Sequence, residues 1–136
     1  MERSARKQLL EHLLRDFDLE DVATQRSETL SGGQRRRLEI ARTMASRPKV
    51  VLLDEPFAGV DPISIESLQS AIRRVRDSGV AVLITDHNVR DTLELVDRAA
   101  LIDRGTVLIE GTPSEITADE TARNRYFGDK FHYERR

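Results

Sequence analysis

The sequence of 136 residues contains no cysteine, which excludes disulfides and thiolate-bound metals. Long hydrophobic runs are also missing. The longest, Val50 to Leu53 and Val80 to Ile84, fall far short of the ~20 apolar residues that span a bilayer. The first residues do not follow a signal-peptide pattern. We therefore expect any association with a membrane to go through a partner.

Neither sign of charge dominates the chain. The 22 Lys and Arg residues and the 24 Asp and Glu residues give a formal net charge of −2, with a pI near 5.9. This balance argues against a general affinity for nucleic acids or anionic membranes, and the local run Arg35-Arg36-Arg37 is interpreted as a solvated helix face. With 38% hydrophobic residues, the chain can form one compact domain or part of one.

Apolar residues recur at helical spacing in three segments, which predicts helices near residues 9–18, 31–47 and 61–78. The third begins with Asp61-Pro62, an acidic cap followed by proline at the first helical position. Gly79 ends it.

Four segments are predicted strands: residues 50–53, 80–84, 99–103 and 106–110. The first two are unbroken apolar runs, as is typical of parallel strands buried on both faces, and the helix between them makes a strand–helix–strand unit. The last two flank Arg104-Gly105 and suggest a hairpin. Thr112 to Glu115 form a capping box that opens a final helix. The predicted fold class is α/β.

Two carboxylates follow the first strand. Asp54 and Glu55 lie where ligands bind in open α/β sheets, beyond the carboxyl ends of the strands. One carboxylate can hold Mg²⁺ and the other can orient an attacking water, and we assign Asp54 to the metal and Glu55 to the water. The same residues could also simply begin a loop.

The segment Leu30-Ser31-Gly32-Gly33-Gln34 is more specific. Ser31 and Gln34 make a capping box, but glycine weakens a helix at the two positions between them. Paired glycines fit a site where an anion approaches the backbone N–H groups of a helix N-terminus. A plain helix cap is the alternative.

Two further residues have both a structural and a functional interpretation. His87 follows a predicted strand, where a neutral imidazole could contact a phosphate, although a lone histidine is more often structural. Asp61 is sufficiently explained as a helix cap even if it also serves function.

The order and spacing of these elements resemble the ATP-binding cassette family over essentially the whole chain. The resemblance implies the C-terminal half of a P-loop NTPase nucleotide-binding domain that uses ATP and Mg²⁺ in a head-to-tail homodimer. Asp54 would bind Mg²⁺, Glu55 would be the general base, Asp61 would link the two sites and His87 would be the switch. The signature residues Ser31, Gly32, Gly33 and Gln34 would contact the γ-phosphate of ATP held by the opposite subunit.

One family motif is absent. No Gly-x-x-x-x-Gly-Lys-Ser/Thr occurs, and none of the three lysines directly follows a glycine. We therefore expect a C-terminal half-cassette, inactive by itself, with a partial helical subdomain at 1–47, part of the ATPase core at 48–112, and a C-terminal helix with an aromatic tail at 113–136.

Within the family, residues 54–64 and 83–90 look like the ATPase subunits of lipopolysaccharide exporters, as does the tail with Tyr126, Phe127, Phe131 and Tyr133. Those exporters often have glutamate where Gln34 stands. Such a subunit would lie on the cytoplasmic face of the bacterial inner membrane, bound to permease subunits. Branched-chain amino-acid importer cassettes are the nearest alternative, although they usually carry Glu-His-Asp at the switch.

Two alternatives come from other classes. The chain could be a non-catalytic truncated product that associates at most with an intact cassette. Chromosome-maintenance and DNA-repair ATPases also have C-terminal lobes with a signature and an Asp-Glu pair, but a long coiled coil precedes those lobes, and residues 1–27 show no sustained heptads.

Overall fold

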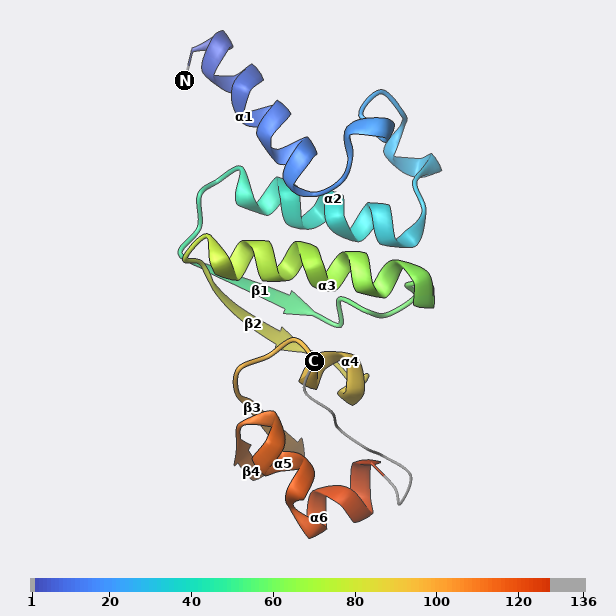
Figure 1. The fold of residues 1–136 in the computed structure, drawn as a ribbon, viewed down its shortest axis with the longest axis vertical. Coiled ribbons are helices and arrows are strands. Elements are labelled where there is room, and N and C mark those ends of the chain that lie inside the picture. The colour runs from blue at the N-terminus through green and yellow to red at the C-terminus, as the bar shows by residue number, and fades with distance from the viewer. Residues whose placement is uncertain (1, 128–136) are drawn as a thin grey trace. The chain divides into compact units, whose positions relative to one another are not determined.

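The computed structural model describes residues 2–127, which form two compact units divided after Thr85 (Figure 1). Within the described residues, no helix combines the length and the apolar composition needed to cross a bilayer.

The first unit contains three helices and a parallel pair of strands. Its elements are α1 (Arg3–Asp16), short 3₁₀ turns at Glu20–Val22 and Ser27–Thr29, α2 (Gly32–Met44), β1 (Val50–Asp54), α3 (Pro62–Asp77) and β2 (Ala81–Thr85). The strands pair from Val50 opposite Ala81 to Asp54 opposite Thr85. This confirms the predicted strand–helix–strand unit, with α3 as the crossover.

Local capping explains where α3 begins and ends. Asp61 accepts a hydrogen bond from the Ser64 backbone N–H (3.0 Å), Pro62 occupies the first turn, and Gly79 follows the helix with φ +87°. The helix buries an apolar face that includes Leu68, Ala71, Ile72 and Val75. Because α2 packs against this helix, the two helices lie side by side (Figure 1).

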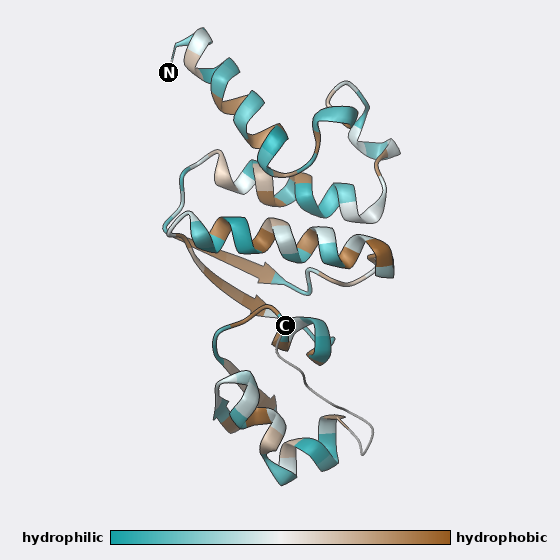
Figure 2. Cartoon of the chain, in the orientation of Figure 1, coloured by the Kyte–Doolittle hydropathy of each residue, from teal (hydrophilic) through white to brown (hydrophobic). Residues whose placement is uncertain are grey.

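The β1–β2 sheet is buried on one face only, although its unbroken apolar strands are typical of a sheet buried on both faces. Val51 is 2% exposed, but Leu52 is 71% exposed and Leu83 is 60% exposed. Both strands are apolar up to their last residues, Asp54 and Thr85 (Figure 2). The reason is that α3 covers one face, while the described residues of the first unit leave the other open.

Two side chains fix the segment after α1. The Nε of Arg37 in α2 donates to the backbone carbonyl of Phe17 at 2.9 Å, and Arg74 in α3 pairs with Asp18 at 2.6 Å. Arg37 is buried, with 8% of its surface exposed. The interpretation of the arginine run as a solvated face was therefore wrong for Arg37, because this helix position faces the buried turn at Phe17.

The second unit contains α4 (Val89–Leu93), the antiparallel strands β3 (Ala99–Asp103) and β4 (Thr106–Gly111), α5 (Pro113–Ala118), α6 (Glu120–Ala122) and a π turn at Arg123–Phe127. The predicted hairpin and the Thr112–Glu115 capping box are both confirmed. Of the tail aromatics, Tyr126 and Phe127 lie in the π turn, whereas Phe131 and Tyr133 lie outside the described residues.

Candidate functional site

The acidic pair lies at the carboxyl end of β1, held by the last residue of β2. The Thr85 hydroxyl donates to the carboxylate of Asp54, and the Thr85 carbonyl accepts from the Glu55 N–H at 2.7 Å. Both acidic residues are exposed. Thr85 was not singled out from the sequence, because only the register of the two folded strands places it opposite Asp54.

Glu55 has an unusual backbone conformation. Its φ of +45° lies in the left-handed region, which costs a non-glycine residue roughly 1–2 kcal/mol. The bond to the Thr85 carbonyl and the turn that follows, in which Ala58 N–H donates to the Glu55 carbonyl at 3.1 Å, hold it there. Strained backbone of this kind clusters at functional sites.

The glycine segment begins α2 as predicted. The Gln34 backbone N–H donates to the Ser31 hydroxyl at 3.2 Å, and the Ser31 N–H donates to the Gln34 side-chain oxygen at 2.9 Å. Gly32 is exposed and Gly33 is buried. The amides of both glycines lie in the first helical turn, where no carbonyl of the same helix can accept from them.

The structure brings this segment to the loop that carries Asp61, which sequence reasoning did not predict. Gly32 and Gly33 lie directly against Gly59 and Ser64. Two hydrogen bonds from Ser64 lower the pKa of Asp61 below its ordinary value. The bond from the Ser64 side chain has the larger effect, and the bond from its backbone N–H has the smaller one. A carboxylate in this position stays charged at neutral pH.

His87 belongs to the second unit, where its imidazole is 75% exposed. Its Nδ1 lies 3.8 Å from an oxygen of the neighbouring Asp86, whose side chain is fully buried. The same Asp86 oxygen accepts from the Asn88 N–H at 2.7 Å. Asp86 therefore fixes the turn that presents His87, a role that sequence reasoning did not assign.

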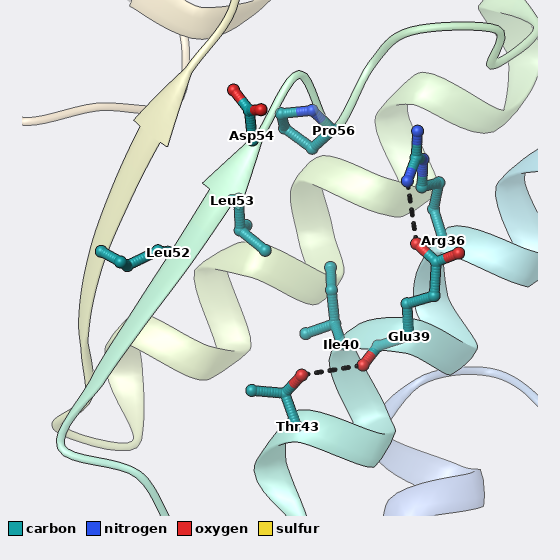
Figure 3. A pocket seen from close by; sticks show the side chains of 8 residues that line it. All are labelled: Arg36, Glu39, Ile40, Thr43, Leu52, Leu53, Asp54 and Pro56. Carbon is teal, nitrogen blue, oxygen red and sulfur yellow. Dashed lines mark hydrogen bonds and ion pairs between the residues drawn. The ribbon is translucent and has the colours of Figure 1, made fainter.

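A small pocket of about 180 Å³ lies between α2 and β1 (Figure 3). It is lined by Arg36, Glu39, Ile40, Thr43, Leu52, Leu53, Asp54 and Pro56, with Arg36 paired to Glu39 at 2.9 Å. Small-molecule sites usually enclose roughly 300–1,000 Å³. The pocket is therefore too small to hold a nucleotide by itself.

Comparisons with known proteins identify the family. The ABC transporter family model matches residues 2–58, which contain the glycine segment and the acidic pair. A probable ABC transporter ATP-binding protein of Azorhizobium caulinodans is 51% identical over 129 residues, 95% of this chain and 46% of that protein. The lipopolysaccharide export system ATP-binding protein LptB of Escherichia coli K12 is 50% identical over 119 residues, 88% of this chain and 49% of that protein. The chain belongs to the ATP-binding family of ABC transporters.

The fold agrees with this membership. The structure of cbiO1 of Clostridium perfringens, part of the ABC transporter complex cbiONQ, superposes with a TM-score of 0.81 at 25% identity, covering 88% of this chain and 48% of that one. The chain spans about half the length of the curated relatives it matches. It therefore has a partial ABC cassette fold, with one parallel and one antiparallel strand pair.

Proposed function

We propose that residues 1–136 are the C-terminal half of the ATP-hydrolysing subunit of an ABC transporter that energises lipopolysaccharide export. The observation that carries the proposal is the 50% identity with E. coli LptB over 88% of this chain. Residues 1–47 would belong to the helical subdomain, 48–112 to the ATPase core, and 113–136 to the C-terminal helix and tail.

Asp54 would hold Mg²⁺, and its surroundings fit that ion. Among the described residues, no group of three or more His, Cys, Asp or Glu side chains could hold a metal by itself. Mg²⁺ needs no such group, because it usually binds one or two carboxylates together with waters and substrate phosphates. Asp54 offers one exposed carboxylate oriented by Thr85. When bound, the ion would neutralise charge on the phosphates.

Glu55 would orient the attacking water and accept its proton. Its carboxylate is exposed, and its backbone is anchored to Thr85, so the side chain projects from a fixed point at the sheet edge. His87 would act as the switch that contacts the γ-phosphate. The buried Asp86 carboxylate beside it supports this role by fixing the local turn.

The signature residues would act on nucleotide held by a second cassette in a head-to-tail dimer. Ser31, Gly32, Gly33 and Gln34 would face the γ-phosphate of that ATP, and Asp61 would connect the two sites. The amino end of α2 supports this, since helix N-termini favour anions. The dimer would bind permease subunits at the cytoplasmic face of the inner membrane, so its membrane association would be peripheral.

A non-catalytic role for the chain alone is the second candidate. The sequence contains no Gly-x-x-x-x-Gly-Lys-Ser/Thr, and the open sheet face exposes Leu52 and Leu83. Without a phosphate-binding loop the chain would not hold ATP by itself. The test must therefore supply that loop.

A chimera provides such a test. It joins the N-terminal half of E. coli LptB to residues 1–136, and ATPase activity is measured on the purified protein. Lipopolysaccharide export is then measured in E. coli cells depleted of their own LptB. We expect both activities. A matched chimera with Glu55→Gln should bind ATP, remain a closed dimer and show neither.

Two controls separate the parts of the proposal. A second chimera carries the C-terminal half of a branched-chain amino-acid importer cassette in place of this chain. If it supports export equally well, the export assignment loses its support while the ATPase assignment stands. A folded first chimera that binds ATP without hydrolysing it would refute the ATPase assignment.

A further inference from the structure

The two signature glycines lie in close contact with the loop that carries Asp61. A Cβ built on Gly33 would lie 2.5 Å from the Cβ of Ser64 and 2.8 Å from its hydroxyl oxygen, closer than Cβ contacts in real proteins. A Cβ on Gly32 would lie 3.0 Å from the carbonyl oxygen of Gly59. The first turn of α2 is therefore shaped to fit the start of α3.

Ser64 is the residue at which these two segments meet. Its backbone N–H donates to the Asp61 carboxylate at 3.0 Å, and its side chain also hydrogen-bonds that carboxylate. The same side chain meets the buried Gly33. Helices α2 and α3 run side by side with their amino ends together (Figure 1), so one contact can set the spacing of both ends.

We propose that Ser64 is a positioning residue, which holds the signature turn (residues 31–34) and the aspartate loop (residues 59–64) as one rigid surface. The inference rests on the function proposed above, in which the signature residues act on the nucleotide of the partner subunit and Asp61 connects the two sites. Ser64 touches neither nucleotide nor metal in this proposal. Its role is to keep the Gly33 backbone and the Asp61 carboxylate at a constant separation.

This proposal explains why residue 33 is glycine without requiring an anion to approach its backbone. If Gly33 is glycine only to let phosphate come near its backbone, an added methyl group obstructs the ligand whatever residue stands at 64. If Gly33 is glycine because Ser64 occupies the space, removing the Ser64 side chain makes room for the methyl group. The two explanations therefore predict opposite results for one double variant.

The experiment uses the chimeric cassette described above, with Gly33→Ala, Ser64→Gly and the pair combined. We measure kcat and KM for Mg·ATP, and the ATP-dependent dimerisation of each variant in the Glu55→Gln background. Gly33→Ala should lower kcat by about tenfold or more and weaken dimerisation, given the coupling typical of residues in contact. Adding Ser64→Gly should restore both to within about threefold of the Ser64→Gly single variant.

Two matched controls sharpen the test. Ser64→Ala removes the hydroxyl but keeps the Cβ that lies 2.5 Å from the built methyl group, so it should not rescue Gly33→Ala. Ser70→Gly makes the same substitution further along α3 and should not rescue either. Thermal unfolding of each variant shows whether lost activity reflects lost protein.

The outcomes separate the two proposals. An inactive but folded wild-type chimera refutes the proposed function. An active chimera in which Ser64→Gly fails to rescue Gly33→Ala overturns the positioning role and leaves anion approach as the reason for the glycine. Equal rescue by Ser70→Gly would also overturn it, because the effect would then come from loosening α3 in general.

Discussion

The contact between Thr85 and Asp54 leads to a quantitative prediction. In the chimeric cassette, Thr85→Val removes the hydroxyl that donates to the Asp54 carboxylate and keeps the β-branched shape that suits a strand. The bond from the Glu55 N–H to the carbonyl of residue 85 is unaffected, because it uses the backbone. The substitution therefore changes the orientation of Asp54 and leaves the anchor of Glu55 in place.

The size of the effect follows from the exposure of the site. A hydrogen bond to a charged group contributes about 1.5–3 kcal/mol, whereas an ordinary one contributes about 0.5–1.5 kcal/mol. Asp54 is exposed, so water competes for its carboxylate and the lower range applies. At about 1.4 kcal/mol per tenfold change, losing this bond should raise the Mg²⁺ concentration for half-maximal ATPase activity by about 2- to 12-fold.

The assay is a titration of ATPase activity with Mg²⁺ at fixed ATP. Thr85→Ser keeps the hydroxyl and should stay near the wild-type midpoint, which makes it the matched control. If Thr85→Val keeps the wild-type midpoint, or if Thr85→Ser shifts it as much as Thr85→Val does, the hydroxyl does not orient Asp54 for the metal and the reasoning fails.

Three further predictions concern other parts of the chimera. Glu55→Gln should lower turnover by about 10²- to 10⁴-fold while nucleotide binding persists, as measured by steady-state ATPase and nucleotide retention. Arg37→Met should lower stability by about 1–3 kcal/mol, because the buried Phe17 carbonyl loses its donor, as measured by urea unfolding. Glu115 should contribute pH-dependent stability, because hydrogen bonds from the backbone and side chain of Thr112 lower its pKa below the ordinary value of 4.5. That stability is present above pH 4.5 and is lost as the pH falls toward the lowered pKa of the folded state.

Each of these predictions has its own control. Asp54 and Thr85 are unchanged in Glu55→Gln, so a loss of ATP binding in that variant would contradict a role confined to water. Arg42→Met, at an exposed position of the same helix, should change stability by less than about 0.5 kcal/mol. For Glu115, the wild type should be more stable than Glu115→Gln at neutral pH, and a difference that stays constant down to pH 3 would argue against the carboxylate as its source.

Most of the secondary structure could be predicted because its signals are local. Ser31 and Gln34, and likewise Thr112 and Glu115, lie three residues apart and form capping boxes wherever the helix that they begin is placed. The acidic pair could be placed at a strand end from the apolar run that precedes it. These inferences need only the next turn of the same helix or the end of the same strand.

The faces that meet in the folded chain could not be predicted. The Arg37 bond to Phe17 spans 20 residues, and the Thr85 bond to Asp54 spans 31. Such contacts depend on the rotation of a helix about its axis or on the register between two strands. The hydrophobic pattern of these segments is compatible with more than one rotation and more than one register. Which face of the sheet is covered could not be assigned for a related reason, since an apolar run shows that a strand can be buried but not which elements cover it.

The sequence by itself therefore determined the order of the helices and strands, their caps, and the resemblance to ATP-binding cassettes, because each is encoded in residues that are neighbours along the chain. Only the tertiary structure decided that Thr85 holds Asp54 and that Gly33 packs against Ser64. Those pairs come from separate elements, and their contact exists only after α2, α3 and the two strands have packed together.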